Sequence, residues 1–294
     1  MSTRLTAVLQ RLDEVVLDKS HTLRLALTCL LARGHLLLED LPGMGKTTLS
    51  HALAKTLGLG FKRIQFTADI LPGDILGTSV FDARSASFSF HPGPIFTELV
   101  LADEINRATA KSQSALLEAM EEGQVTVDGT TYKLPFPFFV IATQNPQHQS
   151  GTYPLPESQL DRFMMRLSLG YPALAAEKAL LLGQERRELL KTIEPLLTQT
   201  ELLTLQAEVK AVNVSDALVD YLLRLVTESR AHAREGLSPR ASLALLSAAK
   251  GWAYLAGRDY VIPEDVQAVF VAVAGHRLRD LGLCQRLLAE VSVF

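Results

Sequence analysis

A glycine-rich turn between a predicted strand and a predicted helix most strongly constrains the fold of this chain. Residues 39–48 (EDLPGMGKTT) follow the apolar stretch Gly34–Leu38 and lead into the helical pattern Thr47–Leu57. Glycines in such a turn let backbone N–H groups point inward around phosphate oxygens, and the helix N-terminus adds a partial positive charge. The usual pattern G-x-x-x-x-G-K-S/T has Gly where this sequence has Asp40. The turn predicts a phosphate-binding loop on an α/β sheet.

The side chains of this loop can be given roles from the chemistry of phosphate binding. Lys46 is expected to reach the β- and γ-phosphates, and the Thr47 hydroxyl is expected to bind Mg²⁺. Asp40 would disfavour phosphate slightly if its carboxylate pointed inward. The predicted nucleotide-binding residues of the loop are Pro42, Gly43, Met44, Gly45, Lys46, Thr47 and Thr48.

Two further polar motifs follow predicted strands. Residues 98–104 (ELVLADE) form an apolar strand that ends in adjacent carboxylates, at the edge of a parallel sheet where ligands gather. Asp103 is expected to hold Mg²⁺, and Glu104 to orient or deprotonate the water that attacks the γ-phosphate. The strand 138–143 is followed by Asn145, whose amide can hydrogen-bond this water or the γ-phosphate. These motifs predict hydrolysis of a nucleoside triphosphate.

The rest of the chain divides into two parts with different patterns. Up to residue 170, apolar runs alternate with helical stretches, which indicates a mostly parallel sheet with right-handed crossovers. Two hairpins interrupt this alternation at Val80–Phe90 and Gln124–Leu134, the second around the favourable turn Asp128-Gly129. The predicted strands are Gly34–Leu38, Phe61–Thr67, Leu99–Ala102, Phe138–Ala142 and Phe163–Leu169.

After residue 171 the pattern is helical, and no strand is convincing. We therefore predict an α/β nucleotide-binding core at 1–170, a linker or first lid helix at 171–190, and an all-α lid at 191–294. The predicted helices occupy about 174–190, 195–211, 215–233, 239–256 and 263–279, with breaks at Gly and Pro residues.

Composition excludes several classes of protein. A hydrophobic fraction of 48% and a charged fraction of 21% exclude a disordered or collagen-like chain. A net charge of −3 makes nucleic acid an unexpected partner. No apolar stretch is long enough to span a membrane, and Met1–Glu14 is an amphipathic helix rather than a secretory signal, so a cytoplasmic location is expected. Cys29 and Cys284 are expected to be buried thiols, and the seven histidines show no metal-ligand spacing.

Five runs together resemble the MoxR family of AAA+ ATPases. They are 37–47 (LLEDLPGMGKT), 102–108 (ADEINRA), 142–146 (ATQNP), 151–157 (GTYPLPE) and 160–163 (LDRF), and 236–242 (GLSPRAS) looks like the Sensor 2 segment of this family. The resemblance extends through nearly the whole chain. It implies a five-stranded AAA+ core, a helical lid, and ATP with Mg²⁺ bound between them.

The resemblance also implies a ring, usually a hexamer, in which one subunit supplies an arginine to its neighbour's site. Arg162 matches the position of this arginine finger, with Arg107 and Arg166 as alternatives. Arg240 matches Sensor 2 and would act on the γ-phosphate of its own subunit or of the next one. The adenine is expected near the N-terminal segment and the lid.

The two hairpins correspond to insertions that face the pore or a partner surface in this branch of AAA+ proteins. Phe81, Phe88 and Phe90 are candidates for gripping a client, and packing of each hairpin onto its own domain is the alternative. Glu121 and Glu122 are expected at an exposed helix end.

A MoxR-type ATPase would use hydrolysis for chaperone-like remodelling or maturation of a protein client, with a von Willebrand factor A domain protein as partner. One alternative is a nucleotide-gated adaptor or scaffold with little turnover, against which Asp103, Glu104 and Asn145 argue. The other is a DNA-associated AAA+ motor, which the acidic composition disfavours.

Overall fold

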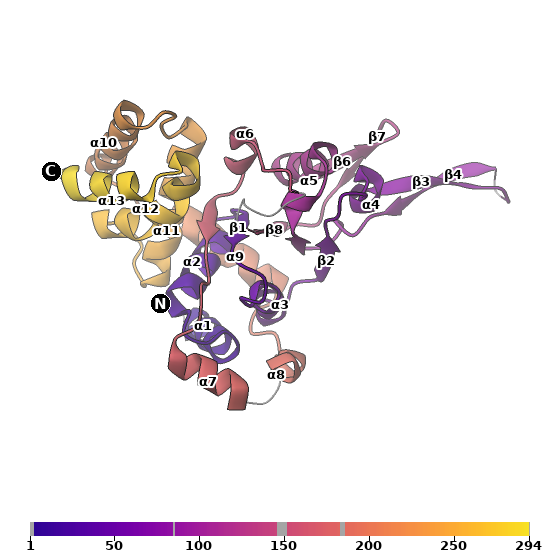
Figure 1. The fold of residues 1–294 in the computed structure, drawn as a ribbon, viewed down its shortest axis with the longest axis horizontal. Coiled ribbons are helices and arrows are strands. Elements are labelled where there is room, and N and C mark those ends of the chain that lie inside the picture. The colour runs from indigo at the N-terminus through magenta and orange to yellow at the C-terminus, as the bar shows by residue number, and fades with distance from the viewer. Residues whose placement is uncertain (1–2, 85, 146–151, 183–185, 294) are drawn as a thin grey trace.

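The fold was analysed in a computed structural model that describes residues 3–84, 86–145, 152–182 and 186–293. Pro146 and Gly151, which belong to the predicted motifs, and His148 lie outside the described residues. Figure 1 shows a central sheet with helices around it, a group of helices formed by the last third of the chain, and a long hairpin that projects away from both.

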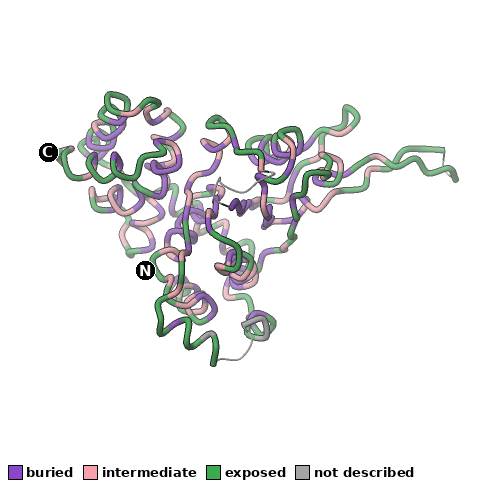
Figure 2. The backbone as a smooth tube through the Cα atoms, in the orientation of Figure 1, coloured by how far each residue is buried: buried purple, intermediate pink, exposed green. Residues whose placement is uncertain are grey.

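The central sheet has five strands in the order β2-β5-β8-β1-β9, and every neighbouring pair is parallel. This confirms the predicted five-stranded parallel α/β core. The strands are β1 (Leu36–Glu39), β2 (Phe61–Gln65), β5 (Leu99–Asp103), β8 (Phe139–Gln144) and β9 (Met165–Leu167). Both β5 and β8 are buried along their length, which explains their continuous apolar sequences. The tube in Figure 2 shows this burial at the centre of the molecule.

Helices flank the sheet and connect its strands. They are α1 (Thr3–Val15), α2 (Ser20–Leu31), α3 (Lys46–Thr56), α4 (Pro72–Leu76), α5 (Ala110–Glu122) and α6 (Glu157–Leu160), with a short 3-10 turn at Ile105–Arg107. Helix α5 ends where Gly123 adopts a left-handed conformation with φ of 63°. Glu121 and Glu122 are therefore at an exposed helix end, as the sequence predicted.

Both predicted hairpins are present. The first pairs β3 (Gly77–Asp82) with β4 (Ser87–Pro92), and the second pairs β6 (Gln124–Val127) with β7 (Thr130–Lys133). In the second, Asp128 and Gly129 both have positive φ, as a two-residue turn of this type requires. The first hairpin is longer than expected because the pairing continues to Gly77 and Pro92.

The aromatic side chains of the first hairpin have two different environments. Phe90 stacks on Tyr132 of the second hairpin with ring centroids 3.9 Å apart. Phe81 and Phe88 pair with each other at 5.2 Å but are 54% and 72% exposed. Packing onto the protein therefore accounts for Phe90 but not for Phe81 and Phe88, which face each other nearer the turn of the hairpin.

The last third of the chain is helical. Its helices are α7 (Leu174–Leu182), α8 (Arg186–Thr192), α9 (Gln199–Ala211), α10 (Asp216–His232), α11 (Pro239–Leu255), α12 (Pro263–Leu278) and α13 (Leu281–Glu290). Helix α9 begins later than the predicted residue 195 because Thr198 and Glu201 form a capping box. The predicted ranges omitted α13, whose N-terminus is capped by Asp280. The proposed domain boundaries stay predictions.

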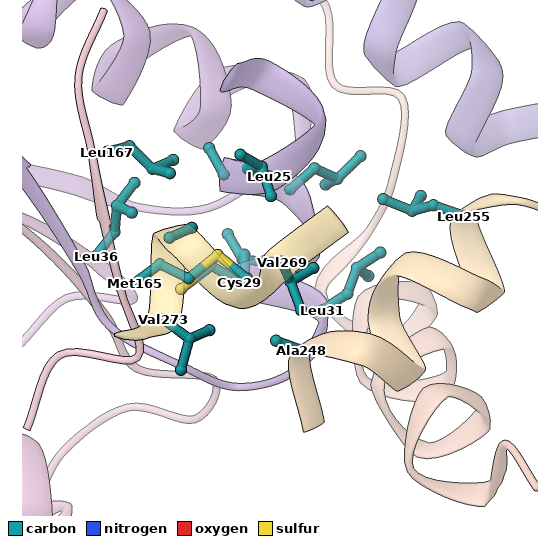
Figure 3. Packing of buried hydrophobic residues seen from close by; sticks show 14 of the residues in the cluster. Leu25, Cys29, Leu31, Leu36, Met165, Leu167, Ala248, Leu255, Val269 and Val273 are labelled. Carbon is teal, nitrogen blue, oxygen red and sulfur yellow. The ribbon is translucent and has the colours of Figure 1, made fainter. Parts of the chain in front are cut away.

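The sheet and the C-terminal helices share one hydrophobic cluster. In it Met165 and Leu167 of β9 and Cys29 of α2 lie close to Ala248 of α11 and Val269 of α12 (Figure 3). A Cβ at Gly251 of α11 would come within 3.1 Å of Thr28. The C-terminal helices are thus packed directly against the core.

Cys29 and Cys284 are both buried free thiols. The described residues include no group of three or more His, Cys, Asp or Glu side chains placed to hold a metal ion. None of the described helices is both long and apolar enough to cross a membrane.

Candidate functional site

The predicted phosphate loop joins the end of β1 to the start of α3. Gly43 and Gly45 have φ of 85° and 88°, a region that residues with a Cβ rarely adopt, and a Cβ on either would meet open space. Gly45 is the N-cap of α3. Pro42 and Thr47 are exposed, and Met44 and Thr48 are half-buried. The loop therefore has open space beside Gly43 and Gly45, and it leads directly into the N-terminus of α3.

Lys46 lies beneath this loop. Its side chain donates to the backbone oxygens of Asp40 at 2.6 Å and of Leu41 at 3.0 Å, and the residue is 8% exposed. Desolvation lowers the pKa of Lys46, while the negative charges of Asp40, Asp103 and Glu104 raise it. The ammonium group thus lies within electrostatic range of the predicted magnesium ligand Asp103 and the predicted base Glu104.

The Asp40 side chain stabilises the structure around the loop rather than pointing inward toward a phosphate. Its carboxylate accepts hydrogen bonds from Ser168 Oγ at 2.6 Å, from the Leu169 backbone N at 2.6 Å and from the Gly170 backbone N at 3.0 Å. These bonds tie the phosphate loop to the chain that leaves β9. Because its lone pairs are used here, Asp40 can replace the usual glycine without directing its charge at a phosphate.

Asp103 and Glu104 lie at the end of β5, beside the end of β8. Thr143 of β8 connects them, because its hydroxyl donates to Asp103 Oδ1 at 2.6 Å and accepts from the Glu104 backbone N at 2.8 Å. Glu104 has a left-handed φ of 57°, which is unusual for a residue with a Cβ and typical of functional sites. Sequence reasoning missed Thr143, because its place beside the carboxylates depends on the pairing of β8 with β5, which the structure reveals.

Asn145 and Glu104 are in direct contact. Asn145 Nδ2 donates to Glu104 Oε1 at 3.2 Å, which brings together two residues predicted to handle the attacking water. Glu104 Oε2 accepts from Gln65 Nε2 at 2.9 Å and forms an ion pair with Arg107 Nε at 3.1 Å. The carboxylate is therefore held by three donors from three different segments.

Strand β2 supplies a partner for Asp103 that the sequence did not indicate. Arg63 donates to Asp103 Oδ2 through Nη2 at 2.5 Å and Nε at 3.0 Å, and its Nη2 also donates to Gln65 at 2.5 Å. Gln65 is directly opposite Asp103 in the parallel register. The alternation of β2 places Arg63 and Gln65 on one face, but only the strand order reveals which carboxylates they meet.

A cavity of about 240 Å³ adjoins the phosphate loop. It lies between the loop, the segment that links α1 to α2, and the chain that follows β9, with mostly apolar walls. Its lining residues are Val15, Val16, Leu17, Lys19, Gly43, Met44, Gly45, Thr48, Gly170 and Pro172. An apolar cavity next to a phosphate loop fits a nucleotide base. Sequence reasoning predicted Gly43, Met44, Gly45 and Thr48 as nucleotide-binding residues, but it named only the N-terminal segment in general and none of the other lining residues.

The predicted arginines do not join this group. Arg162 donates to the Leu117 backbone oxygen at 2.7 Å and pairs with Glu121 Oε2 at 3.0 Å. Arg240 pairs with the other oxygen of Glu121. The two alternatives to Arg162 lie nearer the loop, since Arg107 pairs with Glu104 and Arg166 pairs with Glu39 at 3.0 Å. Arg162 and Arg240 thus form a second cluster with Glu121, at the junction of α5, α11 and the turn after α6.

The chain was compared with families and with known proteins. A model of the ATPase family associated with various cellular activities (AAA) matches residues 35–165, and a model of the AAA lid domain matches residues 226–289. YeaC of Bacillus subtilis is 49% identical over 92% of this chain and 85% of its own length. Chaperone MoxR1 of Mycobacterium tuberculosis is 41% identical over 90% of this chain and 72% of its own length. Protein MoxR of Paracoccus denitrificans is 32% identical over 91% and 86%.

Two solved structures resemble this fold. A Cytophaga hutchinsonii protein superposes with a TM-score of 0.88 and 35% identity, and the match covers 98% of this chain and 94% of the other. A full-length MCM homologue from Methanopyrus kandleri has a TM-score of 0.59 and 18% identity, over 99% of this chain and 62% of the other. The second similarity concerns the fold alone.

Proposed function

Because the chain belongs to the MoxR family of AAA+ ATPases, we propose that it hydrolyses Mg²⁺-ATP at the carboxyl edge of its sheet and works as an oligomeric ring. The contact between Glu104 and Asn145, beside Asp103 and an open phosphate loop, is the observation that carries this proposal. Glu104 would orient and deprotonate the attacking water, and Asn145 would hold both the carboxylate and the water in place.

The residues at the site fit a magnesium ion. The Thr47 hydroxyl is exposed at the start of α3, and Asp103 supplies carboxylate oxygens, which are ligands that Mg²⁺ prefers. Asp103 already accepts bonds from Thr143 and Arg63, so it would hold the ion through its remaining lone pairs or through water. When bound, the ion neutralises charge on the phosphates. Lys46 would add a second positive charge once it turns from the loop carbonyls to the phosphates.

The ring is proposed because Arg162 and Arg240 lie together, away from the phosphate loop and Asp103. Their shared position on Glu121 favours action on a neighbouring subunit's nucleotide, with Arg162 as the arginine finger and Arg240 beside it. A hexamer is the proposed assembly, and the cytoplasm the proposed location.

The proposed work of the ring is chaperone-like remodelling or maturation of a protein client. This proposal is supported by the similarity to a protein named Chaperone MoxR1. The proposed partner is a protein with a von Willebrand factor A domain. The exposed pair Phe81 and Phe88 is the proposed client contact, since an aromatic surface on a projecting hairpin is available for binding.

The test of the proposed reaction compares wild type with Glu104→Gln. This substitution removes the base while keeping the size of the side chain, so ATP should still bind while the steady-state hydrolysis rate falls by about 100-fold or more. Glu118→Gln, at an exposed position of helix α5, is a matched control that should keep the wild-type rate. Retained hydrolysis in Glu104→Gln would remove the assignment of the base.

A further inference from the structure

Glu121 pairs with both of the arginines that, in the proposed mechanism, act on the nucleotide of a neighbouring subunit. Its Oε2 pairs with Arg162 Nη1 at 3.0 Å, while its Oε1 pairs with Arg240 Nη2. The carboxylate is in the last turn of α5, where a negative charge is unfavourable because of the helix dipole. A glutamate at this position is therefore explained by its two cationic partners rather than by the stability of the helix.

The bridge brings the donors of two guanidinium groups to one point. Like charges at this separation repel, and the carboxylate offsets the repulsion. The two arginines come from different parts of the chain, since Arg162 follows α6 and Arg240 is in the first turn of α11. Both donate to a single carboxylate, so their donors already converge on a position that one anionic oxygen group can occupy.

The excess of positive charge around this bridge favours the binding of an additional anion that belongs to another molecule. A cavity of about 320 Å³ is lined by Arg33, Arg162, Arg240 and Arg277 but by only two carboxylates, those of Glu121 and Asp161. Asp161 is already occupied, by Arg277 at 2.6 Å and by Ser238 at 3.0 Å. His35 in the same cavity accepts the Val140 backbone N–H through Nδ1 at 3.0 Å, which requires the neutral ring.

We propose that Glu121 is a positioning residue for ATP hydrolysis. It holds Arg162 and Arg240 side by side until both arginines leave its carboxylate and bind the γ-phosphate of the nucleotide in the neighbouring subunit. The exchange is feasible because the side chains of Arg162, Arg240 and Glu121 are 29%, 47% and 37% exposed, and ion pairs at such exposure are weak. A triphosphate carries more charge than a carboxylate and competes well for both arginines. This inference rests on the proposed function.

The test compares Glu121→Gln with Glu122→Gln, which makes the same change at the next position of the same helix end. Glu121→Gln should lower kcat by about tenfold or more, because two groups that stabilise transition-state charge lose their alignment. KM for ATP should stay within about twofold, because the bridge lies away from the loop that binds the nucleotide. Glu122→Gln should match wild type.

A mixing experiment separates positioning from a merely structural role. Glu121→Gln subunits keep an intact phosphate loop, and Lys46→Ala subunits keep intact arginines, so mixed assemblies should hydrolyse ATP faster than either variant does alone. Wild-type hydrolysis with equal kcat in Glu121→Gln and Glu122→Gln would overturn the inference and leave the proposed function standing. Absence of recovery on mixing would also overturn the inference, and absence of hydrolysis in wild type would overturn both.

Discussion

The nucleotide edge and the arginine cluster differ in how the chain builds them. The nucleotide edge, defined by Lys46, Asp103, Glu104 and Asn145, lies where neighbouring buried strands end, with Asn145 bonded to Glu104 and with Thr143 of β8 bonded to Asp103. The arginine cluster, defined by Arg162, Arg240 and Glu121, is joined from three segments at the junction with the C-terminal helices. In the proposed mechanism, the first region binds a nucleotide within a single chain, while the second acts on the nucleotide of a neighbouring subunit.

The largest effect is expected at the arginine cluster. Arg162→Ala should lower kcat by about 1000-fold, because an arginine supplied to the transferring phosphoryl group stabilises charge that develops in the transition state. Nucleotide affinity measured by calorimetry should change little. Mixing this variant with Lys46→Ala should restore part of the steady-state rate. If the mixture is as inactive as each variant alone, Arg162 either acts within its own subunit or has no role in catalysis.

The junction beneath the arginine cluster should be costly to disrupt. Arg277 of α12 is almost buried and donates to Asp161 Oδ1 at 2.6 Å, to the Phe163 backbone oxygen at 2.9 Å and to the Met164 backbone oxygen at 3.2 Å. Arg277→Met removes these bonds, takes the cationic partner from the Asp161 carboxylate, and should lower the free energy of unfolding by about 3–5 kcal/mol.

The control for this prediction is Arg279→Met. Arg279 pairs with Glu157 at 3.0 Å, and both side chains are nearly half exposed. An exposed pair contributes about 0–1 kcal/mol, so urea unfolding should separate the two variants clearly. Equal losses in the two variants would show that the buried contacts do not secure this junction.

At the nucleotide edge, the expected change is one of affinity. Lys46→Ala removes an ammonium group that would bind the β- and γ-phosphates, and a hydrogen bond to a charged group contributes about 1.5–3 kcal/mol. The dissociation constant for Mg²⁺-ATP should therefore rise by about 10- to 100-fold in a titration. Lys55→Ala, on the same helix, should leave it unchanged.

The smallest effect is a change in the pH dependence of stability, and it is expected at His35, which lines the cavity beside the arginine cluster. Burial lowers the pKa of His35 to about 4, so the folded protein binds fewer protons than the unfolded chain below about pH 6.5. Its contribution to stability is complete above that pH and is lost as the pH falls toward 4, by up to about 1.4 kcal/mol per pH unit.

His35→Asn is the variant that tests this dependence. Asn can still accept from the Val140 N–H but does not titrate, so its unfolding free energy should fall less steeply between pH 6.5 and 4.5 than that of wild type. His276 is buried with a pKa well below its usual value and keeps part of the slope in both proteins. Identical slopes would show that His35 does not titrate differently on folding.

The sequence predicted the nucleotide edge better than the arginine cluster for a physical reason. Phosphate loops and strand-end carboxylates depend on local patterns, so Gly43, Gly45 and Lys46 could be recognised from spacing alone. The five strands were likewise evident from short apolar runs. Arg63 and Thr143 could not be placed, because their contacts with Asp103 depend on strand order, which no local pattern encodes.

The arginine cluster shows the same limit more strongly. The resemblance to a known family identified Arg162 and Arg240 as candidate arginines. It did not indicate that both pair with Glu121, which the sequence predicted only to lie at an exposed helix end. Arg277 could not be identified from the sequence, since an arginine in the last turn of a helix is ordinarily solvated. Helix α13 was missed because its short apolar pattern follows α12 without a proline or a long break.

Calorimetric titration of the full-length wild-type chain with Mg²⁺-ATP tests the central claim most directly. The account predicts saturable uptake of one nucleotide per chain, with Lys46→Ala weakening it. A folded wild-type protein that takes up no Mg²⁺-ATP, or one whose uptake is unchanged in Lys46→Ala, would contradict the assignment of the carboxyl edge as the nucleotide site.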